Sequence, residues 1–112
     1  MFDFIMDLYN YEDRKVDRTE KGNIIIDTEM VSDGDKPFET GVCHPKYNDG
    51  EYIIVEAYDT KGEAQIGHNK WVEIMTIPDN EPEYLMDCCN SKLAQMIDAL
   101  GGEEKSRFPR IE

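Results

Sequence analysis

The alternation of hydrophobic and polar positions predicts strands in the first half of the chain. Residues 2–9 carry apolar side chains at every second position, and residues 23–31 alternate in the same way with Thr28 on the mainly apolar face, which is typical of strands with one buried face. Residues 38–43 form a further short strand pattern, and residues 51–58, rich in β-branched and aromatic side chains, form the strongest one. The mixed charges of residues 10–23 instead predict a loop that ends at Gly22.

The spacing of apolar residues changes to about 3.6 after Asp59, which predicts a helix that ends before Pro78. Thr60 and Glu63 stand at the spacing of a capping box. The stripe of this helix that faces the core is expected to contain Ala64, His68, Trp71, Val72 and Met75. A second, shorter helix is expected at residues 90–100, after an irregular segment with apolar anchors at residues 84–86.

A run of strands followed by helices is typical of an α+β fold. We therefore expect an antiparallel sheet of about four strands in meander order, with two helices packed on one face. Residues 1–102 are expected to form this single domain, and residues 103–112 a flexible tail. The other face of such a sheet is free to meet water or another protein.

The charge of the chain is strongly negative. Its 112 residues include 12 Lys and Arg against 25 Asp and Glu, which gives a net charge of −13. Direct binding to nucleic acid requires a positive face that displaces counterions from phosphates, and no stretch of the sequence supplies one. An acidic domain of this size favours basic protein surfaces, including grooves that hold nucleic acid.

The location of the protein is predicted from two observations. No apolar run approaches the roughly 20 residues of a membrane span, and Asp3 and Asp7 interrupt the apolar start, which lacks the basic region of a signal peptide. The three cysteines are odd in number and two are adjacent, as expected of reduced thiols rather than a disulfide framework. We expect a cytoplasmic protein.

Carboxylates on or beside the predicted strands are the candidates for contact with a partner. Asp27 and Glu29 are expected to share one strand face with Ile25, and Glu56 to share one with Tyr52 and Ile54. Their spacing is not diagnostic of a cation site. A solvated acidic face is the alternative to a functional one. The candidate partner-binding residues are Asp3, Asp7, Asp27, Glu29, Glu39, Glu51 and Glu56.

A second group of candidates consists of soft metal ligands and thiols. Adjacent cysteine and histidine side chains point apart and chelate poorly, so small buried thiols and a packing role for His68 are the preferred interpretation. No nucleophile motif or phosphate-binding glycine motif occurs in the chain, so we expect no cofactor, no metal and no catalytic residue. A metal or thiol site, if formed, would use Cys43, His44, His68, Cys88 and Cys89.

Residues 27–76 resemble a set of small uncharacterised proteins of bacteriophages and prophages. The resemblance rests on the segment SDGDKPFETGV and on YDTKGEAQIGHNKWV, which runs from the last predicted strand into the first helix. The chain departs from the family pattern at Gly62, where Glu is more common, and at Tyr52, where Trp is common. The resemblance implies a phage accessory protein in the cytoplasm of a bacterial host. It implies no known reaction and no catalytic residues.

These observations lead to three functional hypotheses. The first is a non-enzymatic protein that binds and inhibits a host protein, such as a CRISPR effector or another nucleic-acid-binding defence protein, partly by mimicking nucleic acid. The second is a small metal- or thiol-dependent enzyme, or a protein that sequesters a small ligand. The third is a virion or replication accessory that self-associates, since exposed sheet edges favour a homodimer.

Overall fold

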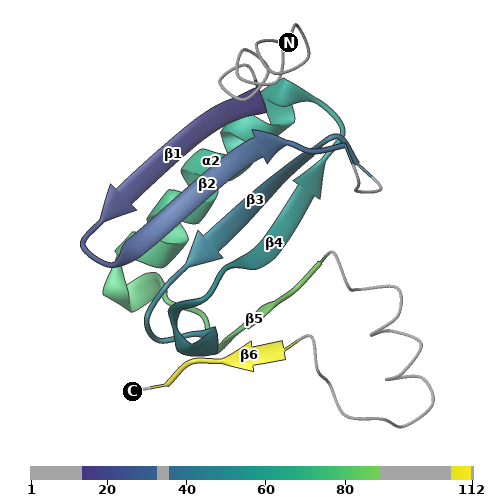
Figure 1. Ribbon diagram of the computed structural model, residues 1–112. Coiled ribbons are helices and arrows are strands. Elements are labelled where there is room, and N and C mark those ends of the chain that lie inside the picture. The colour runs from purple at the N-terminus through teal and green to yellow at the C-terminus, as the bar shows by residue number, and fades with distance from the viewer. Residues whose placement is uncertain (1–13, 33–35, 89–106, 112) are drawn as a thin grey trace, which may run out of the picture.

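The computed structural model describes residues 14–32, 36–88 and 107–111. The described elements are four longer strands, one long helix, two short 3₁₀ turns and two short strands (Figure 1). In chain order they are β1 (Lys15–Lys21), β2 (Ile24–Met30), β3 (Phe38–Cys43), η1 (Asn48–Gly50), β4 (Ile53–Tyr58), α2 (Lys61–Thr76), η2 (Pro78–Asn80), β5 (Tyr84–Met86) and β6 (Arg107–Pro109).

The main sheet is antiparallel, with its strands in the order β1-β2-β3-β4. Helix α2 lies across one face of this sheet (Figure 1). The α+β class and the four-stranded meander are therefore confirmed. The predicted strand at residues 2–9 and the predicted second helix at residues 90–100 lie outside the described residues, so two helices on one face are not confirmed.

The first strand of the sheet lies within residues 10–23. The prediction of a loop for this segment is therefore wrong. The helix-facing positions of this strand are the polar residues Asp17 and Thr19, which bond to side chains of α2, so the strand lacks the usual apolar alternation. The turn to β2 is two residues long, and Gly22 adopts a positive φ of 60° that a tight hairpin requires.

A second, two-stranded sheet pairs β5 with β6 near the end of the chain. Leu85 is 2% exposed and joins the core, as its prediction as an apolar anchor implies. Residues 103–112 are predicted to form a flexible tail, but residues 107–111 are hydrogen-bonded to the rest of the domain. Arg107–Pro109 pair with β5, and the amides of Arg110 and Ile111 donate to the carbonyls of Glu83 and Lys46.

Strand β4 contains one extra residue relative to β3. Thr40 pairs with Glu56 whereas Gly41 pairs with Ile54, so Val55 is a bulge. A bulge shifts the alternation of side chains by one residue, which turns Glu56 toward α2 and leaves Ile54 on the opposite face. The prediction that Glu56 shares a face with Tyr52 and Ile54 is therefore wrong.

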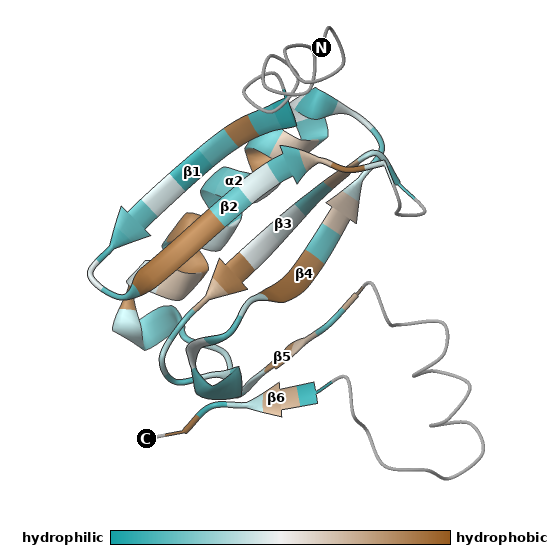
Figure 2. Cartoon of the chain, viewed as in Figure 1, coloured by the Kyte–Doolittle hydropathy of each residue, from teal (hydrophilic) through white to brown (hydrophobic). Residues whose placement is uncertain are grey.

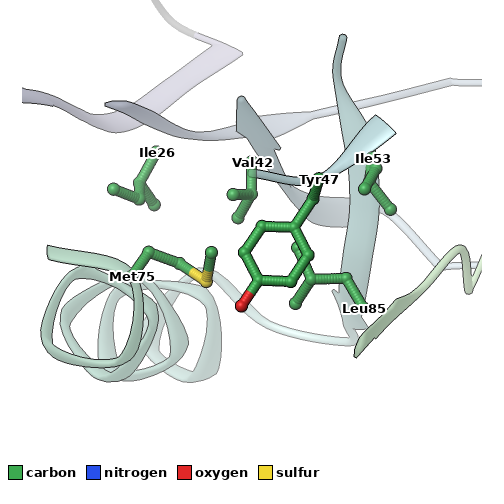
Figure 3. Packing of buried hydrophobic residues seen from close by; sticks show 6 residues of the cluster. All are labelled: Ile26, Val42, Tyr47, Ile53, Met75 and Leu85. Carbon is green, nitrogen blue, oxygen red and sulfur yellow. The ribbon is translucent and has the colours of Figure 1, made fainter. Parts of the chain in front are cut away.

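The space between the sheet and α2 holds two apolar clusters with a polar row between them. The larger cluster lies where β2, β3 and β4 are most hydrophobic (Figure 2), and its sheet residues point toward Met75 of α2 (Figure 3). Figure 3 also shows the ring of Tyr47 lying among these side chains. The larger cluster consists of Ile26, Val42, Tyr47, Ile53, Met75 and Leu85, and the smaller of Phe38, Tyr58 and Ala64.

Helix α2 begins as predicted. The Thr60 hydroxyl accepts a hydrogen bond of 3.1 Å from the backbone amide of Glu63, which confirms the N-cap. Of the predicted stripe, Ala64, His68 and Met75 are buried, whereas Trp71 and Val72 are half-buried. Gly67 is also buried, although the predicted stripe did not include it.

Gly67 sets how closely α2 approaches the sheet. A methyl group at this position would overlap the phenol of Tyr58, whose side chain is only 5% exposed and is held by hydrogen bonds to Thr40 and Glu56. The phenol can therefore move away only by breaking these hydrogen bonds. Gly62, in the same helix, has no atom within 4 Å of the position that a methyl group would take.

We predict that Gly67→Ala lowers the free energy of unfolding by about 2 kcal/mol, because the added methyl group overpacks a rigid contact. The matched control Gly62→Ala is expected to leave stability unchanged or raise it by up to about 1 kcal/mol, since alanine favours a helix. Urea unfolding at neutral pH measures both. Equal stability of the two variants would contradict the close approach at Gly67.

Candidate functional site

The face of the sheet opposite α2 is uncovered in the described part of the chain (Figure 1). We call it the open face. It carries a shallow hollow of about 350 Å³ that spans all four strands. The hollow combines charged and apolar walls, and it is lined by Lys15, Arg18, Asp27, Glu29, Glu39, Gly41, Tyr52 and Ile54.

The carboxylates on β2 are ion-paired with a lysine on β1. The Lys15 ammonium donates to both oxygens of Asp27, at 2.7 and 2.8 Å, and to Glu29 at 3.0 Å. Burial alone would lower the pKa of Lys15, but the bonds to the two carboxylates outweigh this effect and raise the pKa above its ordinary value. Lys15 therefore stays charged and ties β1 to β2.

Arg18 provides the second cation of the open face. Its guanidinium donates to Asp27 at 3.1 Å and to Glu20 at 2.7 and 2.9 Å. It also lies 3.5 Å from the hydroxyl of Tyr52, which connects β1 with the segment that leads into β4. Asp27 thus accepts from two cations, and its side chain is only 15% exposed.

The apolar part of the hollow forms around Gly41 on β3. A Cβ atom at this position would lie 3.3 Å from Cδ1 of both Tyr52 and Ile54, so these two side chains stand over a residue without one. Tyr52 is 47% exposed. The hollow therefore has a backbone floor at Gly41, an aromatic and an aliphatic wall, and charged side chains along β1 and β2.

The structure brings together some of the predicted partner-binding residues and separates others. Asp27, Glu29 and Glu39 line the hollow, and Glu51 is exposed just before β4. Glu56 lies on the opposite face, where it accepts hydrogen bonds from Lys70 and Trp71. Asp3 and Asp7 lie outside the described residues.

Sequence reasoning missed the two cations and Gly41. Lys15 and Arg18 lie in the segment predicted to be a loop, although the Gly22-Asn23 pair between β-compatible residues is a recognised hairpin signal. Gly41 gave an indirect signal, because a glycine inside a strand often marks a place where another group approaches closely.

On the opposite face, the polar row under α2 centres on His68. This side chain is 1% exposed, and each ring nitrogen meets a threonine hydroxyl: Nδ1 lies 2.7 Å from Thr28 and Nε2 lies 2.9 Å from Thr19. Thr28 in turn bonds to Thr40 at 2.6 Å. His68 therefore bridges the helix to β1 and β2, in a packing role as predicted.

The row continues to a carboxylate at the far side of the sheet. Thr40 lies 3.0 Å from the hydroxyl of Tyr58, which donates to Glu56 at 3.2 Å. Burial alone would raise the pKa of Glu56, but hydrogen bonds from Lys70 and Trp71 hold the pKa below its ordinary value. Burial also raises the pKa of Tyr58 to about 12, so this phenol remains a donor.

The ionised carboxylate fixes the direction of every hydrogen bond in the row. Each hydroxyl has one proton. Tyr58 gives its proton to Glu56, so Thr40 must donate to Tyr58, and Thr28 must donate to Thr40. Thr28 can then only accept from His68, which places the proton of the neutral imidazole on Nδ1 and makes Nε2 the acceptor for Thr19.

We predict that His68 is the Nδ1-protonated tautomer at neutral pH. Side-chain ¹⁵N chemical shifts of the labelled protein distinguish the two tautomers, and Nε2 is expected to show the shift of an unprotonated nitrogen. The opposite assignment would mean that the hydrogen bonds of the row run in the reverse direction and that Glu56 is not their terminal acceptor.

Protonation of His68 opposes folding. Burial lowers the pKa of His68 below its ordinary value, although Asp17 and Asp27 raise it in part; Asp17 lies 3.8 Å from Nε2. Burial lowers the pKa of His44 in the same way. The unfolded chain therefore binds more protons than the folded one just below the ordinary histidine pKa of 6.5.

We predict that the urea midpoint of unfolding falls as the pH is lowered from 7.5 to 5.5, because stability present above the unfolded pKa is lost toward the lower folded pKa. His68→Gln, although less stable, is expected to show a smaller fall than the native chain. Asp17 and Glu56 titrate below this window because their pKa values are also lowered. A midpoint that rises toward pH 5.5 would contradict the prediction.

The candidate metal and thiol residues do not converge within the described residues. His68 is enclosed by threonines, whereas His44 packs against Tyr47 and the Cys43 thiol donates to the carbonyl of Gly50. Cys88 follows β5, and Cys89 lies outside the described residues. Across the described ranges, no group of three or more His, Cys, Asp or Glu side chains is arranged to hold a metal ion.

His44 is part of a separate buried pair. Its Nδ1 accepts a hydrogen bond of 3.1 Å from the amide of Lys46, and its Nε2 lies 3.8 Å from Glu81. Glu81 accepts from the Lys46 ammonium through Oε1 at 3.0 Å, whereas its buried Oε2 has no hydrogen-bond partner within the described structure. This pair joins the loop after β3 to the segment before β5.

Comparisons of the chain with family models, with curated proteins and with solved structures found no match. The resemblance to phage proteins, the cytoplasmic location and the homodimer therefore stay predictions. Of the helices in the described ranges, none has the length and apolar composition that crossing a membrane requires.

Proposed function

We propose that this chain is a non-enzymatic binding protein of phage or prophage origin that inhibits a protein of its bacterial host. The observation that carries the proposal is the open face, where a hollow with an exposed tyrosine and an arginine lies on a four-stranded sheet. Tyrosine and arginine are enriched at the centres of protein interfaces, because each gives a large contact area together with hydrogen bonds.

The second support is the way in which the open face is held in shape. Lys15 and Arg18 cross-link β1 and β2 through Asp27, and Arg18 reaches Tyr52 beside β4. Binding to a surface that is already ordered loses less conformational entropy than binding to a mobile one. The hydrogen-bonded face therefore suits recognition of a partner.

The specific form of the proposal is inhibition of a nucleic-acid-binding defence protein, such as a CRISPR effector. The net charge of −13 favours association with basic surfaces. The ion pairs reduce the negative charge that Asp27 and Glu29 can present as mimics of nucleic acid, because Lys15 and Arg18 balance part of it. Mimicry at this face would use the carboxylates that line the hollow, which are Asp27, Glu29 and Glu39.

We predict that Tyr52→Ala lowers the amount of partner captured from host lysate at least about 10-fold, because truncation of a central aromatic residue commonly weakens binding by 2 kcal/mol or more. The matched control is Ile66→Ala, which removes an apolar side chain that is 72% exposed on α2. Capture of the same protein by the native chain and the Ile66 variant, but not by the Tyr52 variant, is the expected result.

Equal capture by both variants would overturn the assignment of the open face. The inhibitory role has its own measurement, in which the chain is expressed in a host with an active CRISPR system and the survival of a targeted plasmid is compared with that in its absence. Unchanged plasmid loss with the native chain would contradict inhibition of that system.

A further inference from the structure

We propose that β1 pairs edge to edge with β1 of a second copy of this chain, so that the two sheets join into one. Within the described part of the chain β1 is an edge strand, and β2 is its paired neighbour. The homodimer expected from the sequence has no assigned surface, whereas the backbone and the charges of β1 specify both the edge and the register. The inference goes beyond the proposed function and does not depend on a host partner.

The first observation is which backbone groups of β1 point away from β2. In an antiparallel pair, hydrogen-bonded positions alternate with positions whose amide and carbonyl groups point outward. The two-residue turn between β1 and β2 closes on Lys21 and Ile24, which makes these two residues a hydrogen-bonded pair. Counting back from the turn, the outward-pointing groups belong to Glu20 and Arg18. Within residues 17–21, a second strand can therefore form backbone hydrogen bonds only with these two residues.

The second observation is that the charges of β1 select one register for an antiparallel pair of this strand with itself. The outward-pointing residues of one copy must oppose those of the other, so the two-fold axis passes through Arg18, Thr19 or Glu20. An axis at Arg18 or at Glu20 places two like charges directly opposite each other, which destabilises a sheet. An axis at Thr19 instead places Arg18 of each copy opposite Glu20 of the other, and opposite charges stabilise the pairing.

The third observation is that the same register matches charges on the side of α2. With the axis at Thr19, Asp17 of each copy lies opposite Lys21 of the other. The side chains are accessible: Arg18, Glu20 and Lys21 are exposed, and Asp17 is 43% exposed. Arg18 already donates to Glu20 of its own strand. A guanidinium has five N–H groups and a carboxylate has about four acceptor sites, so pairing with a second copy adds to this bond.

These charges make the edge selective for a second copy of the same strand. Charged side chains on an edge strand oppose pairing with unrelated strands, which leave the charges without matching partners. A second copy of β1 supplies the matching charges on both faces of the sheet. Side chains at paired positions point to the same side of a sheet, so the open faces of the two copies form one surface in the dimer. This surface presents two hollows to a partner.

The register is tested by NMR on a mixture of ¹³C-labelled and unlabelled full chains, in which only contacts between copies are recorded. Opposed residues that are not hydrogen-bonded have Cα atoms about 4.5 Å apart. We therefore predict a nuclear Overhauser effect between Hα of Asp17 and Hα of Lys21, which lie roughly 13 Å apart within one strand. Signals that connect Thr19 with Asp17 or with Lys21 instead, or no signal between copies, would overturn the proposed register.

Sedimentation velocity over a series of concentrations measures the dimer itself. Glu20→Lys places like charges opposite Arg18 on both sides of the axis and is expected to raise the dissociation constant of the dimer at least about 10-fold. The matched control Glu73→Lys makes the same change of net charge at an exposed position of α2 and is expected to leave the constant unchanged. Urea unfolding of each variant confirms that the sheet remains folded.

Two results would overturn the inference. A native chain that stays monomeric at every concentration has no such edge pairing, and equal effects of the two variants would mean that net charge rather than β1 governs association. Capture of the host partner by a monomeric chain would contradict the dimer and leave the proposed function in place.

Discussion

The contact of His68 with two strands is the interaction on which the arrangement of this domain depends. The imidazole is buried and polar, and both of its nitrogens are bonded to threonine hydroxyls on β1 and β2. A buried polar group without partners would destabilise the fold by roughly 1–3 kcal/mol, so α2 can rest only where these hydroxyls stand. The apolar clusters on either side supply hydrophobic burial, which is not directional. The hydrogen bonds of the polar row are directional and fix the position of α2 on the sheet.

The same row explains why β1 is built from polar residues. Within the described part of the chain, β1 is an edge strand of the sheet, and charged side chains on such a strand reduce pairing with other chains. On the side of the helix, Thr19 and Asp17 of β1 form hydrogen bonds with His68 and Gln65. On the open face, Lys15 and Arg18 of the same strand form ion pairs with Asp27. One strand therefore completes both surfaces of the sheet, and it does so with hydrogen bonds and ion pairs rather than with apolar packing.

The sequence predicted those parts of the fold that depend on local periodicity. Strands β2, β3 and β4, the N-cap at Thr60 and the burial of His68 follow from spacing and capping chemistry alone. Strand β1 escaped prediction because its alternation is one of charge and hydroxyl rather than of hydrophobicity. The face occupied by Glu56 escaped it because a bulge depends on how two strands pair, which a single strand pattern does not contain. The hollow combines residues from four strands, so its cations and its glycine floor emerge only once the register is known.

The bulge at Val55 limits which insertions and deletions the chain can accept during evolution. Loss of one residue at this point would restore regular pairing to β4, but every side chain on one flank of the deletion would exchange sides. Either Tyr52 and Ile54 would enter the core, or Glu56 and Tyr58 would leave the polar row. A length change of a single codon is therefore far more disruptive here than in the two-residue turn at Gly22, and related chains are expected to keep β4 at constant length while their turns vary.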